Sequence, residues 1–68
     1  MTLLQARQVA QDMMRRHGLA AQAVVEELVN EARLSGNAQA LDDWEQIQTM
    51  IAELRREAAS QQASSASR

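Results

Sequence analysis

The side chain with the widest chemical range in this chain is its one histidine, His17. Imidazoles act as general bases, metal ligands and pH switches. No nucleophile or second ligand stands at a spacing from His17 that would support such a role. Because Arg15, Arg16 and His17 directly precede Gly18, we interpret His17 as a positive group at the carboxyl end of a helix, where it complements the helix dipole.

The acidic residues gather in two short stretches. Carboxylates pair as acid and base in some enzymes, and inward-facing carboxylates hold two metal ions inside helical bundles. Such bundle sites usually contain Glu-x-x-His, a pattern that does not occur here. Helical spacing places the acids on solvent-facing sides instead, so we expect no metal site from them. The two groups are Glu26, Glu27 and Glu31, and Asp42, Asp43 and Glu45.

The remaining composition argues against catalysis. There is no cysteine and no tyrosine, so disulfides, thiolate metal sites and two common nucleophiles are missing. Of the hydroxyls, Thr2 is placed to cap a helix, Ser35 lies near a helix end and Thr49 is expected to face outward. The residues therefore predict no enzyme and no bound cofactor.

The net charge of the chain bears on whether nucleic acid could be its partner. The formal net charge is −2 and the basic residues are all arginine, a balance that gives no bulk attraction for phosphate backbones. A short helical chain can contain a helix-turn-helix, with Arg15 and Arg16 as phosphate contacts. The recognition helix would be the predicted second helix. Its exposed face is acidic, which argues against nucleic-acid binding. A DNA-associated accessory or antitoxin-like regulator is kept as the alternative function.

The elements that hold these residues are predicted to be helices. The chain has no proline, two glycines and an aromatic content of 1%, which favours helices over strands. Thr2 and Asn37 are good N-caps, and Gly18 and Gly36 stand where helices would end. The predicted helices span residues 3 to 16 or 17, 19 or 20 to 34, and 38 to 58 or 59.

The last predicted helix carries an apolar stripe at alternating spacings of three and four. Such a stripe forms one face of a helix and must pack against something. The first two helices are short and rich in alanine, so we expect Met50, Ile51 and Leu54 to stay exposed in a monomer. An antiparallel second copy would cover them, which predicts a homodimer. The stripe consists of Trp44, Ile47, Ile51, Leu54 and Ala58.

The other two helices have apolar sides of their own. On the first helix these residues are Leu3, Ala6, Val9, Ala10, Met13 and Met14. On the second they are Ala21, Val24, Val25, Leu28, Val29 and Ala32. The residues predicted to form the core or an interface are Val25, Leu28, Trp44, Ile47, Met50, Ile51 and Leu54.

The ends of the chain differ from its middle. Residues 60–68 have no apolar period and nothing large to bury, so we expect a disordered tail after a helical domain of residues 1–59. The start has no basic region followed by a long apolar run, and no stretch approaches the roughly 18 apolar residues of a membrane span. A cytoplasmic location without membrane contact is expected.

Residues 6–54 contain His17-Gly18 at a predicted helix end, Gly36-Asn37 at a predicted turn, and Trp44 and Ile47 in the last helix. With these features the chain resembles a group of short bacterial proteins. That group shares a His-Gly helix end, an alanine-rich helix, a Gly-Asp or Gly-Asn turn and a Trp-x-x-Ile helix. The resemblance implies a helical fold, and no activity is established for the group. Asn37 stands where aspartate is commoner, and both residues cap helices. The matching residues are His17, Gly18, Ala21, Gly36, Asn37, Ala40, Trp44, Glu45, Gln46, Ile47 and Leu54.

Together these features predict an all-α protein of three helices. The second and third form a hairpin, and the first packs across it. The predicted function is protein–protein interaction, as a small adaptor or regulator that self-associates as a homodimer or binds another protein.

Overall fold

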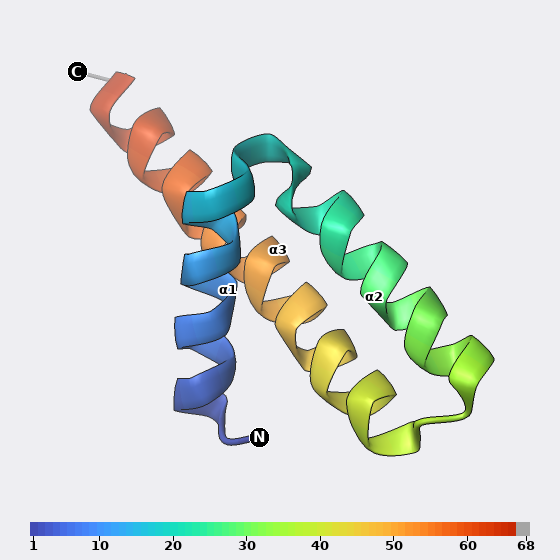
Figure 1. Ribbon diagram of the computed structural model, residues 1–68. Coiled ribbons are helices and arrows are strands. Elements are labelled where there is room, and N and C mark those ends of the chain that lie inside the picture. Colours follow the sequence, from blue (N-terminus) through green and yellow to red (C-terminus); the bar gives the residue numbers. More distant parts are fainter. Residues whose placement is uncertain (67–68) are drawn as a thin grey trace.

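The computed structural model describes the backbone of residues 1–66 and the side chains of residues 1–60. Nearly all of the described backbone is helical, and it contains no strand. The prediction of an all-α fold is therefore confirmed for this part of the chain. In order, the elements are α1 (Leu3–His17), the 3-10 turn η1 (Gly18–Ala20), α2 (Ala21–Ser35) and α3 (Ala38–Ala66) (Figure 1).

The start of α1 is closed by a capping box. The backbone N–H of Gln5 donates to Thr2 Oγ1 at 3.1 Å, and the backbone N–H of Thr2 donates to Gln5 Oε1 at 3.0 Å. These two bonds satisfy amides that have no partner within the helix. At the other end Gly18 has a φ of 57°, a value that few residues other than glycine adopt readily. The chain turns back through η1, and helical conformation resumes at Ala21.

The turn between α2 and α3 needs only Gly36 and Asn37. Gly36 is left-handed, with φ 71° and ψ 22°. The N–H of Asn37 donates to Ala32 O at 3.0 Å and that of Gly36 to Arg33 O at 3.3 Å, the two bonds of a Schellman motif. Asn37 Oδ1 then accepts from the N–H of Ala40 at 3.1 Å and caps α3. The predicted helix stop and start are both confirmed.

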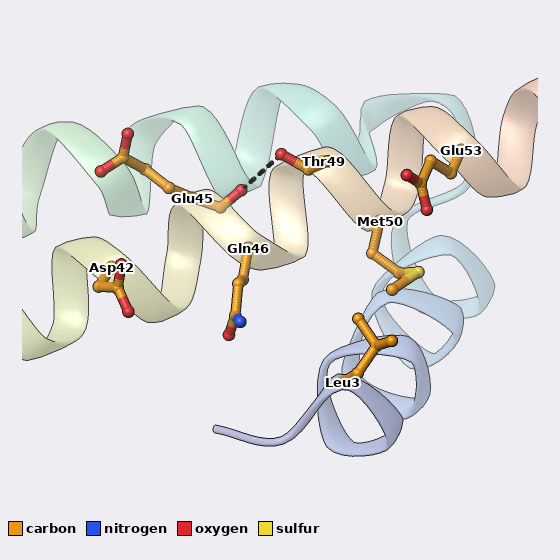
Figure 2. A pocket seen from close by; sticks show the side chains of 7 residues that line it. All are labelled: Leu3, Asp42, Glu45, Gln46, Thr49, Met50 and Glu53. Atoms are coloured by element: carbon orange, nitrogen blue, oxygen red, sulfur yellow. Dashed lines mark hydrogen bonds between the residues drawn. The ribbon is translucent and has the colours of Figure 1, made fainter.

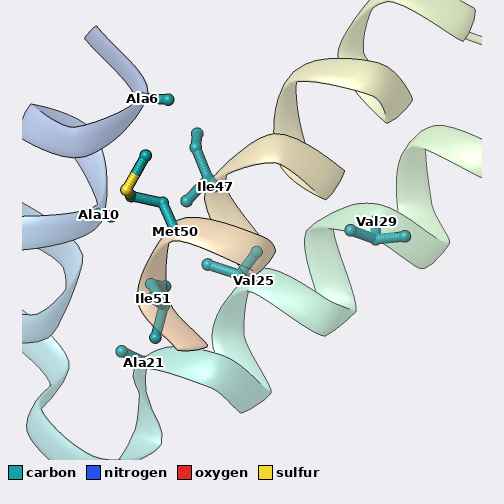
Figure 3. Packing of buried hydrophobic residues seen from close by; sticks show 8 residues of the cluster. All are labelled: Ala6, Ala10, Ala21, Val25, Val29, Ile47, Met50 and Ile51. Carbon is teal, nitrogen blue, oxygen red and sulfur yellow. The ribbon is translucent and has the colours of Figure 1, made fainter. Parts of the chain in front are cut away.

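The core lies where α1 and α2 meet the middle of α3 (Figure 3). The large buried side chains Ile47, Ile51 and Val25 come from α3 and α2. Alanines face them from α1 and α2, and such small side chains let helix backbones approach closely. Complete burial of a side chain such as isoleucine contributes about 1.5–3 kcal/mol. The buried cluster consists of Ala6, Ala10, Ala21, Val25, Val29, Ile47, Met50 and Ile51.

Two expectations about exposure are wrong. Met50 and Ile51 were expected to stay exposed in a monomer, yet they are 7% and 0% exposed. The reason is geometric: α1 covers one side of α3 and α2 lies along another, so the two helices together cover what neither covers alone. Leu54 is half-buried against the same cluster. Leu3 was expected on the buried side of α1, but it is 71% exposed.

The end of α3 also differs from the expectation. The helix continues to Ala66, beyond the end predicted at Ala58 or Ala59, so the described part of the expected tail, from Ser60 to Ala66, is helical. Alanine and glutamine are good helix formers, and extending an existing helix avoids the cost of nucleation. The last part of the expected tail, residues 67–68, lies outside the described residues.

Candidate interaction surface

The carboxyl end of α1 carries the one imidazole of the sequence. His17 is exposed at the end of α1. Next to it, Arg16 Nε lies 3.1 Å from Asp12 Oδ2, an ion pair one helical turn long. Within the described part of the chain, no three histidine or acidic side chains are grouped so as to hold a metal ion. This end of α1 therefore offers a helix terminus and no assembled reaction centre.

Two adjoining hollows form a groove between the start of α1 and the middle of α3, and Figure 2 shows the smaller of the two. We call this the α1–α3 groove. Leu3, Met50 and Glu53 line both hollows. The larger hollow has a volume of about 560 Å³ and also touches Leu4 and Arg7. The smaller hollow, of about 310 Å³, follows α3 and is further lined by Asp42, Glu45, Gln46 and Thr49.

The apolar part of the groove consists of neighbouring side chains. Leu3 and Leu4 are 71% and 66% exposed, and they line the same hollow as Met50. In Figure 2 the side chain of Leu3 points toward the sulfur-bearing end of Met50. Met50 itself is only 7% exposed, so Leu3 and Leu4 supply most of the exposed apolar surface of the groove and Met50 contributes a small part. By contrast, Leu34 is exposed at the far end of α2, where a single leucine is ordinary for a protein surface.

The polar part of the groove is acidic. Asp42 and Glu45 are three residues apart and neighbour each other on α3, and Glu53 lines the same hollow about two turns further along. None of these carboxylates forms an ion pair with another described residue. Among the described lining residues the one cation is Arg7, whose Nη2 atom lies 3.6 Å from Glu57 Oε2. The groove thus presents three carboxylates, unpaired among the described residues, in hollows that its leucines also line.

The hydroxyl of Thr49 takes no part in this acidic character. Its Oγ1 donates to the backbone oxygen of Glu45 at 3.1 Å, along the helix (Figure 2). Thr49 is exposed, as expected from the sequence. The hydroxyl proton of Thr49 is therefore used in a hydrogen bond within α3.

The residues predicted to form a core or interface divide into two groups. Val25, Ile47, Met50 and Ile51 are buried within the single chain. Trp44, Leu28 and Leu54 are half-buried, and Trp44 and Leu54 pack against the core cluster. Trp44 also borders a hollow near the α2–α3 turn, together with Leu28. Most of the residues predicted to form a core or an interface therefore belong to the core of the single chain and not to an exposed face.

Arg55 has a role that sequence reasoning missed. Its Nη1 donates to Gln22 Oε1 at 2.8 Å, and its Nη2 donates to the backbone oxygens of Leu19 and Gly18 at 3.1 and 3.3 Å. The guanidinium therefore fastens the α1–α2 corner to α3 and helps to hold α1 beside the groove. Its partners lie 33 to 37 residues away in sequence, so local spacing does not reveal them.

Comparison of the chain with protein-family models, curated proteins and solved structures gave no match. The resemblance to short bacterial proteins therefore stays a prediction. In the described part of the chain, no helix has both the length and the apolar character needed to cross a membrane. The α1–α3 groove is thus the surface of this chain on which a function can be proposed.

Proposed function

We propose that this protein is a small interaction module, an adaptor or regulator that binds another protein through the α1–α3 groove. The observation that carries the proposal is the exposure of Leu3 and Leu4 beside Met50. Removing apolar surface from water is worth about 25 cal/mol per Å², so covering these leucines favours association. Apolar surface with a polar margin is typical of protein interaction sites.

Self-association stays a prediction, although its original basis has changed. The homodimer was expected because Met50 and Ile51 would otherwise be exposed, and both are buried in the single chain. A dimer would therefore have to use another surface, such as the exposed leucines. A cytoplasmic location also stays a prediction from the sequence.

Three of the arginines interact with other groups of the chain, which does not favour the alternative of a DNA-associated regulator. Arg7 and Arg16 each lie beside a carboxylate, and Arg55 hydrogen bonds within the fold. A nucleic-acid surface needs basic groups clustered on one face. The acidic groove would repel a phosphate backbone.

Site-specific photo-crosslinking in cells tests the proposed function. A photoreactive phenylalanine analogue replaces Leu4 in one variant and Leu34 in a matched control, since both leucines are exposed on helices. We expect one defined protein, identified by mass spectrometry, to crosslink at position 4 and not at position 34. Equal crosslinking at both positions, or none at position 4, would contradict a docking role for the groove.

A further inference from the structure

The shape of the α1–α3 groove suits an elongated partner. Its α3 side runs from Asp42 to Glu53, twelve residues that span about 16 Å at the rise of an α-helix. The α1 side adds Leu3 and Leu4 along one edge. A groove of this length, with apolar side chains on one edge, matches the way amphipathic helices dock, with anchors at successive turns.

The charge of the groove indicates which charged residues its partner would carry. Asp42, Glu45 and Glu53 are exposed and lie in no ion pair among the described residues. In the described part of the lining Arg7 is the single basic residue, and it lies beside Glu57. The lining therefore carries an excess of negative charge. A partner with basic residues on either side of its apolar stripe complements it, and such complementarity favours both encounter and specificity.

We propose that the α1–α3 groove accepts an amphipathic helix of another protein. Leucine-like residues of that helix pack against Leu3, Leu4 and Met50, and its lysines or arginines face the carboxylates of α3. This inference rests on the proposed function, and it adds the chemistry of the partner.

A second copy of the chain fits the groove less well than a basic helix. Face-to-face pairing about a two-fold axis would bring the carboxylates of one groove toward those of the other, because both partners present the same surface. Like charges placed together across an interface oppose association. Anionic lipid is disfavoured for the same reason.

A selection experiment tests the chemistry of the partner. A displayed library presents helices of about 18 residues, or five turns, with leucine fixed on one face. The flanking positions vary among lysine, arginine, glutamate, glutamine and serine. The intact protein is the bait. A counter-selection against the Leu3→Asp, Leu4→Asp double variant discards helices that still bind this variant and therefore do not use the groove. We expect the remaining helices to be enriched in lysine and arginine.

Charge-reversed baits then locate the interaction. For the selected peptide, we expect Glu45→Lys with Glu53→Lys to weaken binding by about tenfold or more. The control, Glu26→Lys with Glu27→Lys, makes the same change of net charge on exposed α2 residues, and its affinity should stay within roughly twofold of the parent. Circular dichroism verifies that each variant is folded.

The outcomes separate the two proposals. Groove-dependent helices that are neutral or acidic, or equal losses in both charge-reversed baits, would overturn the basic partner and leave the docking role intact. The absence of any groove-dependent binder would overturn the inference and the docking role together. Sedimentation that shows a dimer sensitive to Leu4→Asp would assign the groove to a second copy instead.

Discussion

Replacement of Ile51 by alanine tests whether the single chain covers its own apolar stripe. Ile51 is 0% exposed and belongs to the cluster that joins all three α-helices. Substitutions of buried isoleucine by alanine cost about 2–5 kcal/mol, and more where neighbours cannot fill the space. Because Ile51 is surrounded by residues of α1 and α2, we expect a cost of about 3–4 kcal/mol.

That cost is large for a chain of this length. At about 0.05–0.15 kcal/mol per residue, 68 residues correspond to a free energy of unfolding of about 3–10 kcal/mol. A domain of this size loses about 4–8 °C of melting temperature per kcal/mol. We therefore expect Ile51→Ala to melt about 12–30 °C below the parent, with part of the population unfolded at room temperature if the parent is at the lower end of that range.

Far-ultraviolet circular dichroism, followed against temperature and urea, measures the effect. The matched control is Leu34→Ala, because Leu34 is 89% exposed and surface substitutions usually stay within about 0.5 kcal/mol. Ile51→Val, which removes one methyl group, should cost about 0.5–1.5 kcal/mol and fall between the two. If Ile51→Ala had the same melting temperature as Leu34→Ala, the placement of Ile51 in a core within the monomer would be refuted.

Three further outcomes are expected. Gly36→Ala should destabilise the protein by about 1–2 kcal/mol in urea, because its φ is 71° while an added Cβ meets nothing within 4 Å; Gly36→Asn should cost less, and equal costs would contradict this cause. Arg55→Ala should lower the free energy of unfolding by about 1–2 kcal/mol and speed amide exchange in η1. Arg55→Lys should restore little of either, because an ammonium lacks the planar fork of a guanidinium. Unchanged exchange would contradict the role of Arg55 in holding the α1–α2 corner to α3. A homodimer requires the melting temperature to rise over about a hundredfold increase in protein concentration, and a constant melting temperature would exclude it.

The helix ends were predictable because their causes are local. Thr2 reaches its partner three residues away, and Asn37 does the same. Gly36 has the left-handed conformation that its place after a helix indicates. The end of α3 was not predictable in this way, since no glycine, proline or capping residue follows Ala59 to stop the helix.

The covering of the stripe was not predictable because it depends on how three helices meet. Spacing indicated correctly that Ile47 and Ile51 share a buried face, but it carries no information on which element covers that face. The answer came from α1, where Ala6 and Ala10 are both fully buried against the cluster. Their small side chains had suggested a helix too poor in apolar area to cover α3, whereas in the structure they allow close approach.

The same arrangement accounts for the groove. Ala6 and Ala10 bring α1 onto α3, while Leu3 and Leu4 of the first turn remain exposed beside Met50. The residues that close the core are thus different from the residues that line the groove on α1. Since Leu3 and Leu4 bury little surface in the single chain, their substitution should remove little folding energy. Loss of binding in a folded Leu4 variant can therefore be attributed to the groove, which separates recognition from stability even in so small a protein.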